Sequence, residues 1–419
     1  MRLAFRAVCS HGCCLFTSDG CAVRAESPTK KGKLMLLQES RAVLEQYAPG
    51  LDGELAEQGL LVMEGKEPAA IRALIRRYRL PRLWVPSALG GAAISPYDGI
   101  RMQRAVAARA PSMALMLTMH NFTVSFCNAL AAYVPCCERM LRDVAHDDLL
   151  VASAFAEGRR GAGILDSTVY MTPDGADFLI DGSKKPCTMS GCMDIITVGV
   201  AVKTPDGGKR TGLAVLPAGE PGVTQRPFWS VPLLAAADNH ELRFDKVRVS
   251  ADQVLLAAEG DNETAQVVAS AEVLGLCWFE IVASASYLGA VSGMAERVVA
   301  DTGVDETERV LLGGELESAQ AALDGAVHLM QTSEPNESLL ARVLMIRFGV
   351  QRIIERCAMQ AAELAGGLAF VRDRELMTQL AISRCLAFHP ISRKAARPLL
   401  AAWLEAGASG PSAAVAAAN

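Results

Sequence analysis

Apolar residues recur at three- and four-residue steps through the first part of the chain, as in "MLLQESRAVLEQYA", "EPAAIRALIRRYRL" and "YDGIRMQRAVAARA". This spacing places them on one face of a helix. Two prolines and two glycines in "LPRLWVPSALGG" interrupt the pattern. We therefore predict an N-terminal α-helical domain over residues 35–150.

The middle of the chain has a different pattern of short runs rich in β-branched residues, such as "TVYMTPDGADFLIDG", "DIITVGVAVKTPDGGKRTGLAVL" and "HELRFDKVRV". Pro-Asp-Gly at 173–175 and at 205–207 is typical of a hairpin turn. These features predict a barrel-like middle β domain over residues 151–257.

Helical periodicity returns over residues 262–406 in four long segments joined by short links, the last of them "ELMTQLAISRCLAFH". Long amphipathic helices with short connections predict a C-terminal four-helix bundle. The fold class is therefore α+β, with helical domain, β domain and bundle in that order. Residues 1–34 are predicted to be a disordered leader and residues 407–419 a flexible tail.

The first bundle helix is apolar enough to suggest a membrane span, with Glu280 as its one charge between Glu272 and Glu296. Glycine and serine dilute it and no basic flank orients it, which favours a buried bundle helix. The chain is 51% hydrophobic and 21% charged, as expected of a large globular enzyme. Its net charge of -5 includes no basic cluster beyond "KKGK", so we expect neither a nucleic-acid nor a membrane partner.

Eight of the twelve cysteines lie among apolar or small residues, which predicts reduced, buried thiols and a cytoplasmic protein. They are Cys127, Cys136, Cys137, Cys187, Cys192, Cys277, Cys357 and Cys385. The other four, Cys9, Cys13, Cys14 and Cys21, lie close to His11. Their spacing matches no common zinc motif, so we favour a disordered leader, or upstream sequence included by an early start codon, over a metal cluster.

Five segments carry a resemblance to one family. They are "SAFAEGRRGAG" (153–163), "FLIDGSKKPCTMSG" (178–191), "HELRFDKVRVSADQVLL" (240–256), "RVLLGGELESAQ" (309–320) and "AAELAGGLAF" (361–370). In this order and at these intervals they resemble motifs of the acyl-CoA dehydrogenase superfamily, over residues 36–405. Several family residues are replaced, so the chain resembles a divergent member.

The resemblance implies that FAD lies between the β domain and the bundle, and that a second subunit holds its diphosphate, which requires a homodimer or homotetramer. An arginine suits that role because its guanidinium pairs with two phosphate oxygens. Arg309 could also be a solvated charge at a helix end, and Thr188 an ordinary strand residue. The implied cofactor-binding residues are Phe155, Glu157, Thr188, Arg309, Gln320, Glu363, Gly366 and Gly367.

In the family reaction a carboxylate removes a proton next to an acyl thioester and hydride passes to the flavin. Where most members carry that glutamate, this chain has "FHP" at 388–390. A branch exemplified by isovaleryl-CoA dehydrogenase keeps it on the first bundle helix, and Glu280 lies one residue from that position. A carboxylate in an apolar helix must be paired, protonated or functional, so Glu280 is either the base or a structural group.

Two histidines are further candidates. Some relatives on this fold use reduced flavin and oxygen and carry a histidine near the flavin, which His389 resembles. Alternatively, His389 ends a helix, stabilised by the helix dipole and followed by Pro390. His120 lies on a helix that lines the acyl pocket in the family, and is either a pocket or a core residue.

The leading hypothesis is an FAD-dependent dehydrogenase that converts an acyl thioester of CoA or of an acyl-carrier protein to the enoyl thioester. Its electron acceptor would be a flavoprotein or oxygen. The first alternative is a reduced-flavin-dependent monooxygenase on the same fold, and the second is a non-catalytic binding subunit.

Overall fold

A computed structural model describes residues 36–159, 167–204, 208–256 and 262–405. The predicted leader with its four cysteines, the predicted tail and the Pro-Asp-Gly turn at 205–207 lie outside the described residues.

The N-terminal part is helical, as predicted. Its helices are α1 (Gln38–Tyr47), α2 (Leu51–Gln58), α3 (Leu60–Glu64), α4 (Pro68–Arg77), α5 (Pro96–Arg109), α6 (Pro111–Leu130) and α7 (Pro135–Asp147). Two short 3-10 turns, η1 (Leu80–Arg82) and η2 (Ser87–Leu89), occupy the proline- and glycine-rich interruption. Helices α4 to α7 each begin at a proline, whose fixed φ suits the first helical position.

The middle part forms one eight-stranded sheet. The strands are β1 (Val151–Ala154), β2 (Tyr170–Asp174), β3 (Asp177–Cys187), β4 (Ile195–Lys203), β5 (Lys209–Pro217), β6 (Val223–Arg226), β7 (His240–Val249) and β8 (Val254–Leu255). Their order is β6-β7-β3-β2-β4-β5-β8, and β1 pairs in parallel with β4. The predicted hairpin at 173–175 joins β2 to β3, and its Gly175 has a φ of 67°. Two further 3-10 turns, η3 (Ala235–Ala237) and η4 (Ala251–Gln253), flank β7.

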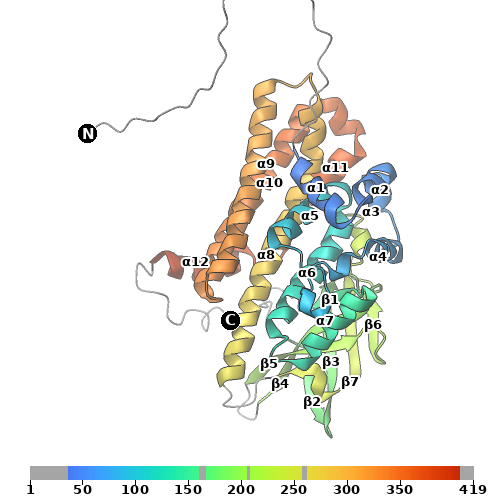
Figure 1. Ribbon diagram of the computed structural model, residues 1–419, viewed down its shortest axis with the longest axis vertical. Coiled ribbons are helices and arrows are strands. Elements are labelled where there is room, and N and C mark those ends of the chain that lie inside the picture. Colours follow the sequence, from blue (N-terminus) through green and yellow to red (C-terminus); the bar gives the residue numbers. More distant parts are fainter. Residues whose placement is uncertain (1–35, 160–166, 205–207, 257–261, 406–419) are drawn as a thin grey trace, which may run out of the picture. The chain divides into compact units, whose positions relative to one another are not determined.

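The C-terminal part contains three long helices that run side by side, α8 (Asn262–Ala300), α9 (Glu306–Thr332) and α10 (Glu337–Arg372) (Figure 1). The fourth long helix of the prediction is wrong. That segment divides into α11 (Arg374–Ile382), the 3-10 turn η5 (Cys385–Phe388) and α12 (Arg393–Glu405). His389 is extended, with a ψ of 145°, because a following proline excludes the helical conformation.

Helix α8 is the core element to which the other helices attach. It packs against α5, α6, α9 and α10, and nearly every residue from Phe279 to Ala295 is buried. At Gly289 the backbones meet so closely that a Cβ would lie 2.2 Å from the carbonyl oxygen of Arg104 on α5. Among the described helices α8 is long and apolar enough to cross a membrane, but half of its most hydropathic window is buried here. Its packing agrees with the predicted bundle helix.

Candidate active site

His389 lies at the centre of a group of side chains that the chain brings together from distant positions. Its Nε2 atom is 2.6 Å from the hydroxyl oxygen of Tyr287 on α8. Its ring lies edge-on to Phe279, with the ring centroids 5.6 Å apart. Burial, and secondarily the charge of Arg347, lower the pKa of His389 to about 4. The imidazole is therefore neutral at physiological pH. His389 does end a helix, as the C-cap of the 3-10 turn η5, but it carries no charge for a helix dipole to stabilise.

A row of rings continues from His389 toward the N-terminal domain. Phe279 meets Phe122 of α6 with centroids 5.3 Å apart, and Tyr287 stacks at a tilt on His389 at 5.4 Å. We call Phe122, Phe279, Tyr287 and His389 the aromatic cluster. It joins α6, α8 and the segment before α12. The cluster buries the Tyr287 phenol and covers part of the imidazole, which is half-buried.

Glu280, predicted as a base or as a structural carboxylate, is fully buried and has close partners. Its Oε2 atom is 3.1 Å from Nε of Arg347 on α10, and its Oε1 accepts a hydrogen bond from the backbone N–H of Ile391 at 2.9 Å. Burial raises the pKa of Glu280 to about 7, although Arg347 and Ile391 favour the charged form. Both oxygens are thus directed at groups within the protein.

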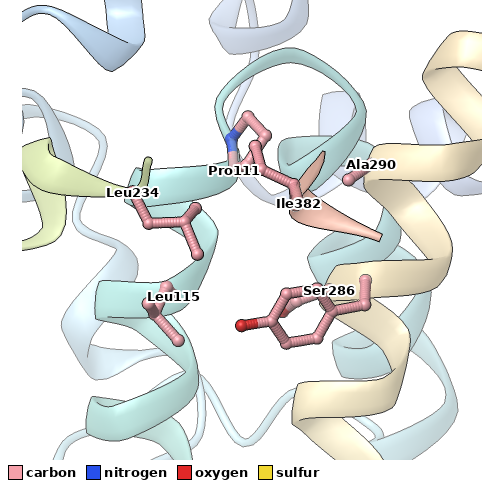
Figure 2. A pocket seen from close by; sticks show the side chains of 7 residues that line it. Pro111, Leu115, Leu234, Ser286, Ala290 and Ile382 are labelled. Carbon is pink, nitrogen blue, oxygen red and sulfur yellow. The ribbon is translucent and has the colours of Figure 1, made fainter. Parts of the chain in front are cut away.

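A small apolar pocket lies beside the aromatic cluster (Figure 2). It is a cavity of about 10 Å³ lined by α6, α8, the end of α11 and the residue before η3. The lining residues are Pro111, Leu115, Leu234, Ser286, Tyr287, Ala290 and Ile382. Tyr287 belongs both to the pocket lining and to the hydrogen bond with His389, so it connects the two.

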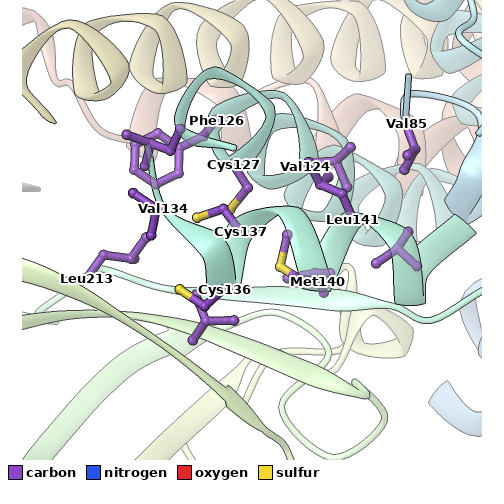
Figure 3. Packing of buried hydrophobic residues seen from close by; sticks show 14 of the residues in the cluster. Val85, Val124, Phe126, Cys127, Val134, Cys136, Cys137, Met140, Leu141 and Leu213 are labelled. Atoms are coloured by element: carbon purple, nitrogen blue, oxygen red, sulfur yellow. The ribbon is translucent and has the colours of Figure 1, made fainter. Parts of the chain in front are cut away.

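The eight described cysteines are unpaired, and seven of them are buried as predicted, whereas Cys385 is partly exposed. Cys127, Cys136 and Cys137 belong to the apolar cluster between α6, α7 and the sheet (Figure 3). Burial raises the pKa of Cys187 and Cys192 to about 12, which keeps these thiols protonated. They are packing groups and take no part in the site.

Glu157, implied to contact the cofactor, lies in a buried ion pair with Lys184 of β3. It also accepts hydrogen bonds from the backbone N–H and the hydroxyl of Thr168. Burial would raise the pKa of Glu157, but the Lys184 ammonium and the Thr168 donors outweigh it and lower the pKa. Nζ of Lys184 donates further to Ser167 at 3.1 Å. Glu157 therefore holds the strands together, and a direct flavin contact stays a prediction.

Phe155 and Thr188 lie in the same β domain. Phe155 is edge-on to Phe126 of α6, with centroids 6.4 Å apart, so it ties the sheet to the helical domain. The Thr188 hydroxyl donates to Oδ1 of Asn239 at 2.7 Å, just after β3 ends. These placements do not test either residue as a flavin contact.

The remaining implied cofactor residues lie on two helices of the bundle, Arg309 and Gln320 on α9, and Glu363, Gly366 and Gly367 on α10. Nε of Arg309 and Oε1 of Gln320, both on α9, are buried and have no hydrogen-bond partner among the described residues. On α10, Glu363 is exposed and Gly366 kinks the helix with a φ of 82°. No described atom lies within 4 Å of a Cβ built at Gly366 or at Gly367.

Arg309 and His389 are not neighbours within one chain. Arg309 donates to the carbonyl of Val299, which is twelve residues after Tyr287 on α8 and therefore about 18 Å further along the helix. The unpaired polar atoms and the open glycines fit a polar group that comes from outside this chain.

His120 is a core residue in the structure, which supports the second of its two predicted roles. It is fully buried, with Nε2 2.9 Å from the carbonyl oxygen of Pro81 and Nδ1 accepting from the N–H of Val151 at 3.1 Å. Burial lowers the pKa of His120 to about 4. With both nitrogens engaged, it fastens α6 to η1 and β1 and has no atom left for a substrate.

Tyr287 and Arg347 belong to the site but were not predicted from the sequence. A signal existed for both: Tyr287 lies seven residues after Glu280, on the same helical face, and Arg347 interrupts the apolar run "VLMIRFGV". An arginine in an apolar helix needs a buried partner, and Glu280 was the matching carboxylate.

No protein-family model matches the chain. A curated relative does: isobutylamine N-hydroxylase of Streptomyces viridifaciens is 34% identical over 375 residues, which cover 88% of this chain and 98% of that protein. Two solved structures of the acyl-CoA dehydrogenase fold are similar. FMN-bound TdsC of Paenibacillus sp. A11-2 has a TM-score of 0.71 at 18% identity, over 88% of this chain and 97% of that chain. A nitrososynthase of Micromonospora carbonacea var. africana has a TM-score of 0.71 at 18% identity, over 90% and 98%.

The chain belongs to the acyl-CoA dehydrogenase superfamily. The family resemblance and the α+β fold class are thus confirmed, and this superfamily member is a flavin-dependent oxidoreductase. The relatives are an N-hydroxylase, a nitrososynthase and, in TdsC, a dibenzothiophene monooxygenase. They favour the monooxygenase alternative of the sequence analysis over its leading hypothesis, a thioester dehydrogenase.

Proposed function

We propose that this protein is a reduced-flavin-dependent monooxygenase that oxidises a small aliphatic amine at nitrogen. The observation that carries the proposal is the environment of His389. At the place where a dehydrogenase of this fold needs its carboxylate, this chain has a neutral imidazole, hydrogen-bonded to a buried tyrosine and flanked by aromatic rings.

Glu280 supports the same proposal because it is unsuited to act as the base. A base that abstracts a proton from carbon must present an oxygen to the substrate. Oε1 of Glu280 accepts from Ile391, Oε2 faces Arg347, and the side chain has no solvent-exposed surface. These contacts favour the structural role of Glu280 over its role as a base.

The cofactor in this proposal is a flavin, and the unpaired atoms of Arg309 and Gln320 with the open Gly366 and Gly367 suit its phosphate-bearing end. When bound in reduced form, flavin supplies the electrons that activate oxygen. TdsC was solved with FMN, whereas the sequence motifs imply FAD, and we retain FAD as the proposal. Because Arg309 lies far from His389 in one chain, a second copy would complete the site, as a homodimer or homotetramer.

The residues of the aromatic cluster have distinct roles in this proposal. The His389 imidazole and the Tyr287 hydroxyl share a hydrogen bond and can hold or pass one proton at Nε2. Phe122 and Phe279 exclude water, which strengthens polar interactions at the imidazole.

An amine substrate is proposed on two grounds. The curated relative is named for isobutylamine, and the lining of the cavity beside Tyr287 is mainly apolar. Leu115, Leu234 and Ile382 would face a short branched alkyl group, but the cavity of about 10 Å³ has room for about one water molecule and would have to widen to admit it. Enlarging Ala290 to valine is expected to lower kcat/KM for isobutylamine by about tenfold relative to methylamine, because the added methyls compete for the alkyl space. An unchanged ratio would contradict this pocket assignment.

Purified protein tests the function directly. With reduced flavin, air and isobutylamine, we expect oxygen uptake and formation of the hydroxylamine, and no bleaching of bound flavin by butyryl-CoA without oxygen. His389→Asn should lower hydroxylamine formed per flavin oxidised. Anaerobic bleaching by the thioester would restore the dehydrogenase hypothesis instead, and failure to bind any flavin would favour a non-catalytic subunit.

A further inference from the structure

The segment "LAFHPI" (386–391) carries His389 but has little regular structure of its own. It spans the end of η5 and the link to α12. Phe388, next to His389, is 85% exposed, so its side chain does not anchor the segment in the core. Leu386 is fully buried, and its carbonyl also accepts from the N–H of His389 at 3.2 Å. The position of the imidazole must therefore depend on contacts at the two ends of the segment.

Both ends are held by one buried ion pair. Nη2 of Arg347 donates to the carbonyl of Leu386 at 2.5 Å, and Oε1 of Glu280 accepts from the N–H of Ile391 at 2.9 Å. Arg347 and Glu280 face each other at 3.1 Å, with side chains 1% and 0% exposed. The two residues that they bind, Leu386 and Ile391, lie before and after His389 in the sequence.

The pair is itself held in place. Nη1 of Arg347 donates to Oε1 of Gln351 at 2.7 Å, and Gln351 donates to Glu355 at 2.6 Å. Glu355 pairs with Arg384, which lies just before η5. This chain of contacts leads from α10 back to Arg384, close to the segment. A shift of Arg347 would therefore move its own contact with Leu386 and, through Glu280, the contact with Ile391.

We propose that Glu280 and Arg347 are positioning residues that hold the His389 imidazole against Tyr287 and Phe279. The proposal rests on the proposed oxygenase function only where it concerns turnover; the placement of His389 is a property of the flavin-free protein. A buried ion pair adds little net stability compared with apolar residues, so stability alone is a poor reason for this arrangement. A displacement of about 1 Å at a reacting group can cost about 100-fold in rate.

The test uses NMR of the flavin-free full chain labelled at the histidine Cε1 positions. The chain has six histidines, and the signal that disappears in His389→Asn identifies His389. Arg347→Met removes the contact to Leu386, and Glu280→Gln keeps an acceptor for Ile391 but removes the charge. In both variants we expect the His389 signal to shift or broaden, because the imidazole leaves the rings of Tyr287 and Phe279.

Arg356→Met is the matched control. Arg356 lies on the same helix and pairs with Glu315, but both side chains are largely solvent-accessible, at 57% and 35%. This control should leave the His389 signal unchanged. In turnover, Arg347→Met should lower hydroxylamine formation about 10- to 100-fold with little change in KM, whereas Arg356→Met should not.

Where Arg347→Met does not fold, the double variant Glu280→Gln/Arg347→Met replaces it, because it leaves no unpaired buried charge. A folded variant with the wild-type His389 signal overturns the positioning role. A shifted His389 signal supports it even if the wild type proves unable to oxygenate amines, so the two proposals fail separately.

Discussion

Replacement of Lys184 by methionine tests whether Glu157 belongs to the flavin site or to the structure of the β domain. The substitution keeps the length and the apolar stem of the side chain but removes its charge. Glu157, whose side chain is 2% exposed, is then left as a buried carboxylate. It keeps two hydrogen bonds from Thr168 and an ion pair with the exposed Arg159, 3.7 Å away.

The expected cost follows from these contacts. Removing one partner of a buried ion pair typically costs about 3–5 kcal/mol, because the other charge stays unpaired. The Thr168 donors and the Arg159 guanidinium offset part of this, so we expect a loss no larger than the lower end, about 3 kcal/mol. The double variant Glu157→Gln/Lys184→Met has no buried charge and should lose at least about 1 kcal/mol less than the sum of the two single variants.

The assay is urea denaturation followed by circular dichroism, with flavin affinity measured in parallel. Arg142→Met is the control, because its pair with Glu138 on α7 is exposed and should contribute less than about 1 kcal/mol. Flavin affinity of Glu157→Gln should stay within about threefold of wild type, less than 1 kcal/mol. A large loss of flavin affinity at unchanged stability would refute the structural role and restore Glu157 as a cofactor contact.

Two further predictions concern packing and pH. Gly289→Ala should destabilise the protein by about 1–3 kcal/mol, although alanine favours helices, because its Cβ would meet the backbone of Arg104. The control is Gly325→Ala, at an exposed position of α9 where a Cβ has no neighbour within 4 Å; it should be neutral or stabilise the protein by up to about 1 kcal/mol. His120, whose folded pKa of about 4 lies below its ordinary 6.5, stabilises the fold above pH 6.5 and loses this contribution as the pH falls toward 4. The free energy of unfolding, measured with urea at several pH values, should therefore fall less between pH 6.5 and pH 4 in His120→Asn than in wild type. The same dependence on pH in both proteins would contradict the assignment of His120 as a neutral core histidine.

The sequence alone was sufficient for the fold class. Helical spacing, the change to β-rich runs and the return of long helices are local patterns, and they gave the three regions in their observed order. Local chemistry also marked the Pro-Asp-Gly turn at 173–175 and the burial of seven cysteines. The fourth bundle helix was mispredicted because a periodic pattern does not show where long-range contacts end a helix.

The composition of the site depended on tertiary structure. The sequence singled out Glu280 and His389, but their partners are distant: Arg347 is 67 residues from Glu280, and Tyr287 is 102 residues from His389. Which helix faces meet is decided by packing of whole elements around α8, and no local pattern encodes it. That packing determined that Glu280 pairs with Arg347 and that His389 faces Tyr287, because a buried charge must find its partner wherever the fold provides one.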